Sequence, residues 1–131
     1  MNSVVSKDEY LARFIIRPEH VRADGTVKPD PFIPYKWVEL SVTRHIGLTE
    51  VQIWAFGGLV ASNVGKRLQG RGDAQAEVFL RQSLSVVASP ETTNPNHANV
   101  VGWPVDKHAQ KAIALELVKD VRFKKTPAPV A

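Results

Sequence analysis

The chain has 131 residues, of which 44% are hydrophobic and 23% charged, and it carries a formal net charge of +4. These proportions are typical of one globular domain, and a chain of this length buries enough surface to fold without a disulfide or a metal. The absence of cysteine excludes disulfide scaffolds, zinc ribbons, thiol nucleophiles and cysteine-bound iron–sulfur clusters. Since no apolar run has the length of a signal peptide core or a membrane span, we expect a cytoplasmic protein with no membrane partner.

The positive charge permits nucleic acid or another polyanion as a partner. A charge of this size is also ordinary for a small soluble domain. The basic residues are spread along the chain except for two local groups, Lys66-Arg67 with Arg71, and Arg122 with Lys124-Lys125. Composition therefore leaves both interpretations open.

Two strands are predicted in the first third of the chain. Residues 11–16 are apolar and β-branched apart from Arg13, which suggests one exposed face. After a turn at Asp24-Gly25, where glycine supplies a positive φ, the prolines of residues 29–34 predict an extended segment. Residues 37–44 alternate between apolar and polar side chains, the pattern of a half-buried strand, and His45 extends its polar face.

A helix is predicted to begin at Thr49. Thr49 and Gln52 have the spacing of a capping box, in which each side chain bonds a free backbone N–H of the other residue. One apolar face with helical spacing follows, formed by Ile53, Phe56, Gly57 and Val60. Gly57 on that face implies close packing against a neighbour, and Gly65 fits a C-terminal cap.

Further along, residues 66–72 predict a short strand and a turn, and Asp73 then suits the N-cap of a short helix that ends near residue 82. Residues 84–88 are rich in valine and predict another strand. Residues 89–96 are rich in proline, asparagine and threonine and predict a loop.

The last third is predicted to hold a strand, a helix and an edge strand. Residues 98–103 predict a short strand or extended segment across the core, and Pro104 suits the start of a mostly buried helix. Residues 122–125 predict an edge strand whose lysines discourage further pairing. The whole pattern predicts an α+β fold, a small mixed β-sheet packed with two or three helices, as a single domain over residues 10–125 between flexible ends at 1–9 and 126–131.

His97 is the first candidate for chemistry. It follows the predicted loop, and Asn99 stands two residues further on. Because histidine suits proton transfer near neutral pH, His97 is a candidate catalytic acid or base and Asn99 a candidate ligand-binding residue. The alternative is that both side chains hydrogen-bond the backbone of their own loop.

Gly70-Arg71-Gly72-Asp73 is the second candidate. Free backbone amides at a helix N-terminus beside an arginine suit a phosphate, so Gly70, Arg71 and Asp73 are candidate ligand-binding residues and Arg71 a candidate catalytic charge stabiliser. The segment lacks the full P-loop and dinucleotide patterns. The alternative is a turn held by an Arg–Asp contact.

Two further groups complete the candidates. Arg44 and His45 end the polar face of a predicted strand, which either lines a cleft or is solvated, and they are a candidate ligand-binding residue and a second candidate acid or base. Tyr35 and Trp37 flank a proline-rich turn and are candidate contacts for a protein partner. The four histidines lack metal-binding spacing, so we expect no metal and no cofactor, while a histidine–carboxylate site assembled only by the fold stays open.

Several segments resemble a group of small uncharacterised bacterial proteins. The similarity rests on Ser41-Val-Thr-Arg44, Leu68-Gln-Gly-Arg-Gly-Asp73 and His97-Ala-Asn-Val-Val-Gly-Trp-Pro104, within residues 10–121. The resemblance implies a bacterial, single-domain, cytoplasmic protein, and it implies no activity and no catalytic residue.

The sequence supports three hypotheses. The first is a binding protein for nucleic acid or a phosphate-containing ligand. The second is an adaptor or inhibitor subunit of a larger complex, bound through Tyr35 and Trp37. The third is a small metal-independent nuclease with His97 or His45 as acid or base and Arg71 as charge stabiliser. Whether the protein is an enzyme stays open at this point.

Overall fold

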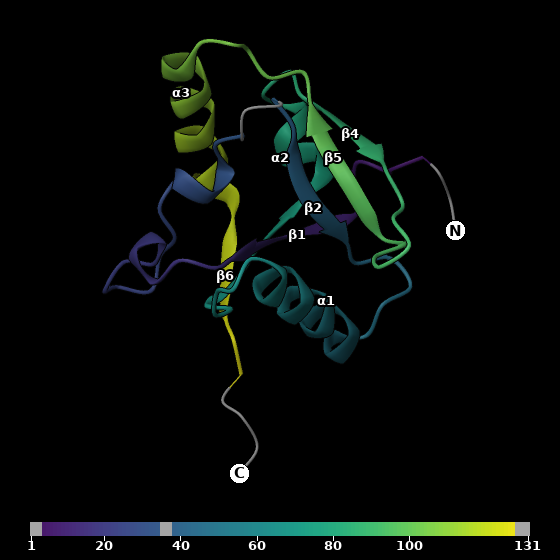
Figure 1. Cartoon of the computed structure of the whole chain (residues 1–131). Helices are drawn as coiled ribbons and strands as arrows, with labels where there is room; N and C mark the ends of the chain where they lie inside the picture. Colours follow the sequence, from purple (N-terminus) through teal and green to yellow (C-terminus); the bar gives the residue numbers. More distant parts are fainter. Residues whose placement is uncertain (1–3, 35–37, 128–131) are drawn as a thin grey trace.

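The computed structural model describes residues 4–34 and 38–127. These residues form one six-stranded sheet with three α-helices and three short 3-10 helices (Figure 1). In chain order the elements are β1 (Tyr10–Ile15), η1 (Pro18–His20), η2 (Asp30–Phe32), β2 (Leu40–Arg44), α1 (Glu50–Asn63), β3 (Gly70–Gln75), α2 (Ala76–Leu80), β4 (Ser85–Ala88), β5 (His97–Val101), α3 (Lys107–Leu117), η3 (Val118–Asp120) and β6 (Arg122–Lys125). The predicted α+β class, with one sheet and a few helices, is confirmed.

The strand order is β4-β5-β2-β1-β3-β6, and every pairing is antiparallel. β1 pairs with β3 along its whole length, but with β2 only at Leu11↔Arg44 and Ala12↔Thr43. β1 and β2 therefore separate beyond these two pairs. β4 and β6 form the edges of the sheet, which confirms the edge strand predicted for residues 122–125.

Helices cover the two faces of the sheet. On one face, Leu11 of β1 belongs to the main core together with Phe79 of α2 and Leu117 of α3. On the other face, Phe14 of β1 packs with Ile53 of α1, because successive strand residues point to opposite faces. Figure 1 shows α1 on the side of the sheet away from α3. β1 is thus covered on both faces, and the expectation of one exposed face was wrong.

The helix α1 begins as predicted. The Oγ1 of Thr49 accepts a hydrogen bond from the N–H of Gln52 at 3.2 Å, and the Gln52 side chain accepts from the N–H of Thr49 at 2.8 Å. Gly57 allows the close approach of Phe14, since a Cβ at position 57 would lie 2.7 Å from the Phe14 ring. Gly65 follows the helix with a φ of +66°, the left-handed conformation that favours glycine at this place.

The segment Gly70–Gln75 is strand β3, so the predicted turn and the N-cap at Asp73 were wrong, although a short helix does form within the predicted range. β3 pairs with β1 on one side and with β6 on the other, which commits its backbone groups to the sheet. Its glycines admit close neighbours, because a Cβ at Gly72 would lie 2.8 Å from the side chain of Val121. Helix α2 begins only after Gln75, whose side chain makes no capping hydrogen bond.

Three other expectations also change. The last helix begins after Asp106, which accepts a hydrogen bond from the N–H of Ala109 at 2.9 Å, and not at Pro104. Only three of its residues are buried, because one side of α3 faces solvent. Asp30–Phe32 forms η2 instead of extended chain, and Phe32 has no exposed surface.

The remaining elements follow the sequence pattern. Residues 89–96 form the predicted loop between β4 and β5, and Gly25 has the expected positive φ of +85°. Within the described part of the chain, no helix has the length and hydropathy needed to cross a membrane.

Candidate functional site

A group of ionisable side chains lies where the first turn of α1 meets β3 and β6. Arg71 and Asp73 are two residues apart on β3, so their side chains leave the same face of the sheet. Lys124 of β6 is the register partner of Arg71, and Glu50 is the first residue of α1. We call these four residues, together with His45, the β3 charge cluster.

Arg71 is the centre of the cluster, and its side chain has no exposed surface. Its Nε donates to both oxygens of Asp73 at 3.0 and 3.1 Å, and its Nη2 donates to Glu50 at 2.9 Å. The guanidinium carbon lies 4.6 Å from the ring centroid of Trp54. Burial alone would lower the pKa of Arg71, but the hydrogen bonds and charges of the two carboxylates outweigh burial and raise it. Arg71 is therefore a structural cation that has no surface to offer a ligand.

The two carboxylates differ in exposure. The Asp73 side chain is 9% exposed, whereas the Glu50 side chain is 58% exposed. The hydrogen bond from Arg71 lowers the pKa of Glu50, and the ammonium group of Lys124 lies 3.4 Å from the same carboxylate. Asp73 is thus the buried partner of Arg71, and Glu50 connects the pair to solvent.

His45 brings an imidazole to the cluster. Its Nε2 lies 3.2 Å from Oδ1 of Asp73 but lacks the alignment of a hydrogen bond, and it has no other partner in the described part of the chain. The ring of Tyr10 lies 6.1 Å from the His45 ring, centroid to centroid. A histidine beside a carboxylate is an arrangement suited to proton transfer.

A polar cleft of about 410 Å³ opens over the cluster. Its charged lining residues carry both signs. Arg81, Arg122 and Lys124 are basic, and Glu50, Asp73 and Asp120 are acidic. Because the signs nearly balance, the cleft has no strong preference for an anion.

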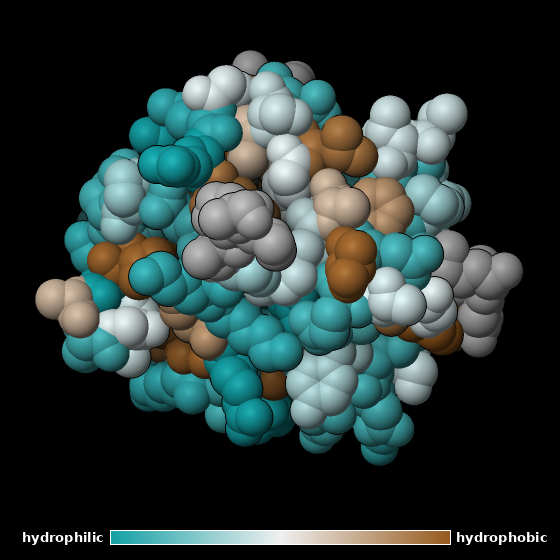
Figure 2. All heavy atoms as spheres, turned by 90° about the horizontal axis from the view of Figure 1, so that it is seen from below, coloured by the Kyte–Doolittle hydropathy of each residue, from teal (hydrophilic) through white to brown (hydrophobic). Residues whose placement is uncertain are grey.

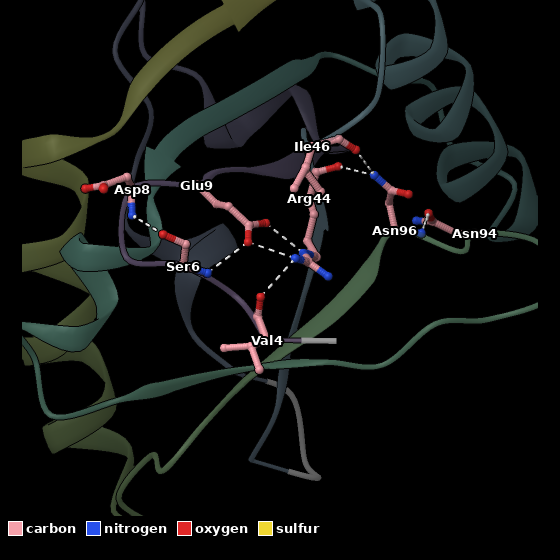
Figure 3. Close-up of polar contacts among 8 residues, drawn as sticks. All are labelled: Val4, Ser6, Asp8, Glu9, Arg44, Ile46, Asn94 and Asn96. Atoms are coloured by element: carbon pink, nitrogen blue, oxygen red, sulfur yellow. Dashed lines mark hydrogen bonds and ion pairs between the residues drawn. The ribbon is translucent and has the colours of Figure 1, made fainter. Parts of the chain in front are cut away.

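Arg44 lies apart from the cluster, in a separate network (Figure 3). Its Nε and Nη2 donate to the two oxygens of Glu9 at 2.7 and 2.8 Å, and Nη2 also donates to the carbonyl of Val4. Its own carbonyl accepts from the Asn96 amide, which bonds the carbonyl of Ile46 as well. The hydrogen bonds from Arg44 lower the pKa of Glu9. Arg44 thus fastens residues 4–9 and the loop before β5 to the sheet.

His97 and Asn99 lie on β5, which begins directly after the loop. In the register, His97 faces Thr43, Thr43 faces Ala12, and Ala12 faces Asp73. Three strand spacings, roughly 14 Å, therefore separate His97 from Asp73. The His97 Nδ1 lies 2.8 Å from the carbonyl of Ser89, which agrees with the local hydrogen-bonding alternative for this residue.

The other sequence candidates fall elsewhere. Gly70 lies inside β3, where Phe123 and the carbonyl of Lys124 occupy the space of a Cβ, so it offers no open loop to a phosphate. Tyr35 and Trp37 lie outside the described residues. Among the residues that the structure describes, no cluster of His, Asp and Glu side chains has metal-binding geometry.

A second concave surface lies beside Trp54 and measures about 660 Å³. Its lining comes from α1, the segment before β3, and β6 with the residues after it, namely Trp54, Gly58, Arg67, Leu68, Gln69, Lys125, Thr126 and Pro127. None of these residues is acidic. Arg67 and Lys125 are exposed and form no ion pair within the described ranges. We call this surface the basic groove.

The side of the molecule that carries α1 is mainly hydrophilic, with small separate hydrophobic patches (Figure 2). A binding surface on this side therefore depends on charge and on single aromatic side chains, and not on one broad apolar area.

Sequence reasoning missed Glu50 and Trp54 as members of the site. The two residues stand four positions apart in a predicted helix and so share one face, which was a usable signal. Nothing in the sequence places that helix face over β3.

Comparisons of this chain with protein-family models, with curated proteins and with solved structures find no match. The resemblance to small bacterial proteins stays a prediction, and the function has to be argued from the site alone.

Proposed function

We propose that this protein binds single-stranded nucleic acid in the basic groove. In this proposal Trp54 stacks on a base while Arg67 and Lys125 contact phosphates. The observation that carries the proposal is a partly buried tryptophan, held from one side by Arg71, in a groove whose charged lining residues are both cations.

Trp54 has the properties of a stacking platform. The Arg71 guanidinium covers one face of the indole, and Arg71 is itself held by Glu50 and Asp73. Arg71 is not among the residues that line the groove, so the indole surface that lines it lies away from Arg71. A ring that is already held loses little freedom when a base stacks on it, and such stacking contributes about 1–3 kcal/mol per base.

The charges of the groove suit a phosphodiester chain. Arg67 and Lys125 have no carboxylate partner that a bound phosphate would have to displace. Lys66 is exposed next to Arg67 in sequence and adds a further positive charge, whereas Lys124 is paired with Glu50 in the β3 charge cluster. A single strand suits this arrangement better than a duplex, because a duplex hides the faces of its bases in the stack.

The test is titration with an oligothymidylate of roughly ten nucleotides, within the range of known single-strand sites. We expect binding at low salt, quenching of tryptophan fluorescence, and loss of most of that quenching in Trp54→Phe. The double variant Arg67→Ala/Lys125→Ala removes two phosphate contacts, so the slope of log K against log salt should fall by about 1.4.

The matched control is Lys107→Ala/Lys111→Ala, which removes the same charge from exposed positions on α3. It should leave affinity and slope close to those of the unmodified protein. Absence of binding at low salt, or equal losses in the two double variants, would refute the groove as the site.

The structure offers less support for the nuclease hypothesis and for the protein-partner hypothesis. The nuclease hypothesis needs Arg71 at the reacting phosphate, and Arg71 has no exposed surface. The contacts suggested for a protein partner, Tyr35 and Trp37, lie outside the described residues. A cytoplasmic location is part of our proposal and is checked by fractionation of the source cells.

A further inference from the structure

The last turns of α1 and the neighbouring sheet enclose a cavity that the proposed nucleic-acid site does not use. It has a volume of about 270 Å³ and lies over the place where β1 and β2 separate. Its residues come from α1, from β1 and β2, and from the loop that leads into β5. Pockets for small molecules begin near 300 Å³, so the cavity suits a small ligand.

One wall of the cavity is apolar. Phe56, Leu59 and Val60 of α1 form this wall with Val64, which directly follows the helix, and Phe14 of β1 joins it. Leu59 is 48% exposed and Val64 57% exposed, although both lie beside a hollow that would cover them if it were filled. An apolar group in the cavity would remove this surface from water, which is favourable at about 25 cal/mol per Å².

The opposite side of the cavity carries Arg13, a cation without a carboxylate partner in the described part of the chain. Its Nε donates to the carbonyl of Pro31 at 2.7 Å, and its Nη1 donates to the carbonyl of Ser41 at 3.0 Å. Nη2 has no acceptor within the described ranges. Burial lowers the pKa of Arg13 to about 10, and no neighbouring charge offsets that effect.

Neutral hydrogen-bonding groups complete the lining. Ser41, Thr43 and Asn94 contribute hydroxyl and amide groups, and Asn94 is held in place by donating to Thr43 at 2.9 Å. The His97 Nδ1 lies 2.8 Å from the carbonyl of Ser89, and because a carbonyl oxygen only accepts, Nδ1 is the donor in this hydrogen bond. The one carboxylate of the lining, Glu91, is 55% exposed and lies 3.9 Å from His97.

We infer that this cavity binds a small organic carboxylate with an aromatic or branched aliphatic body. The apolar wall of α1 would cover the body, and Arg13 would bind the carboxylate, for which an arginine has matching donor geometry. Charge complementarity favours a carboxylate over a neutral ligand. Arg13 is partly buried and lacks a counter-ion, so an anion stabilises its charge more than a neutral group would.

The experiment records amide chemical shifts during titration with 1-naphthoate and, separately, with 1-naphthamide, which has nearly the same shape and no charge. We expect saturable shifts with the acid, confined to Arg13 and Phe14 of β1, to the second half of α1, to Ser41 and Thr43, and to residues 91–97. The amide should bind at least fivefold more weakly. This comparison tests the role of Arg13 without replacing it, which matters because Arg13 also holds η2 and β2.

A second arm fills the cavity. Val60→Trp places an indole in the hollow and should abolish the shifts, whereas Val51→Trp, on the same helix but outside the lining and 78% exposed, should leave them unchanged. No saturable binding of the acid, equal binding of acid and amide, or full binding by Val60→Trp would each overturn the inference.

Discussion

Replacing Asp73 by asparagine tests whether the fold depends on a carboxylate that compensates the buried charge of Arg71. Asp73 is 9% exposed and accepts two hydrogen bonds from Arg71, whose side chain has no exposed surface. The substitution Asp73→Asn keeps the shape of the side chain and removes its charge. Arg71 would then retain Glu50, which is 58% exposed, and the ring of Trp54.

The expected loss is large for one substitution. Removing one partner of a buried ion pair costs about 3–5 kcal/mol, because the other charge stays buried. The contacts to Glu50 and Trp54 persist, so we expect a value at the lower end, about 3 kcal/mol of unfolding free energy. In a chain of this length each kcal/mol shifts Tm by about 4 °C, which gives a decrease of about 12 °C.

The assay is chemical denaturation followed by circular dichroism, with Asp120→Asn as the matched control. Asp120 contacts Arg81 at 3.9 Å, and both side chains are more than half exposed, so this pair should contribute under 1 kcal/mol. Glu50→Gln should fall between the two. A loss below about 1 kcal/mol for Asp73→Asn, or a larger loss for Glu50→Gln, would show that Asp73 is not the group that compensates Arg71.

Two other predictions concern packing and pH. Gly57→Ala should destabilise the protein by about 1–3 kcal/mol because a Cβ would lie 2.7 Å from Phe14, whereas Gly58→Ala, with nothing within 4 Å, should stabilise it by about 0.5–1 kcal/mol in thermal unfolding. Equal effects would contradict the close contact. Since Arg44 holds the pKa of Glu9 below 4.5, the stabilisation is complete above pH 4.5 and is lost as pH falls through the folded-state pKa. Glu9→Gln should therefore be less stable than the unmodified protein at neutral pH, and the difference should shrink as the pH is lowered below 4.5, which a series of denaturation curves would reveal.

Secondary-structure elements that are set by interactions between residues close in sequence could be predicted from the sequence. The capping box of Thr49 and Gln52 places the start of α1 because both hydrogen bonds form within four residues. The turn at Gly25 and the edge strand at residues 122–125 were predicted for similar local reasons. The alternation of residues 37–44 also predicted that Leu40 and Val42 are buried, although the strand as described begins only at Leu40.

The candidate site could be predicted only in part. Arg71, Asp73 and His45 were all selected by residue type, and the fold brings these three together. His97 and Arg44 were selected by the same reasoning, and the fold places them elsewhere. Arg13 was treated as the mark of an exposed face, yet it is the cation of the cavity, because β1 and β2 separate just beyond Ala12.

The sequence by itself determined the α+β class, the helix α1, the edge strand β6 and the residue types available for binding. Only the tertiary structure decided that Gly70–Gln75 is a strand, since its partners β1 and β6 lie far away along the chain. It also decided that Arg44 pairs with Glu9 and Arg71 with Glu50, so that two arginines expected at a ligand are buried. The physical reason is that periodicity shows which side chains share a face of one element, whereas strand order and long-range pairing decide which elements that face meets.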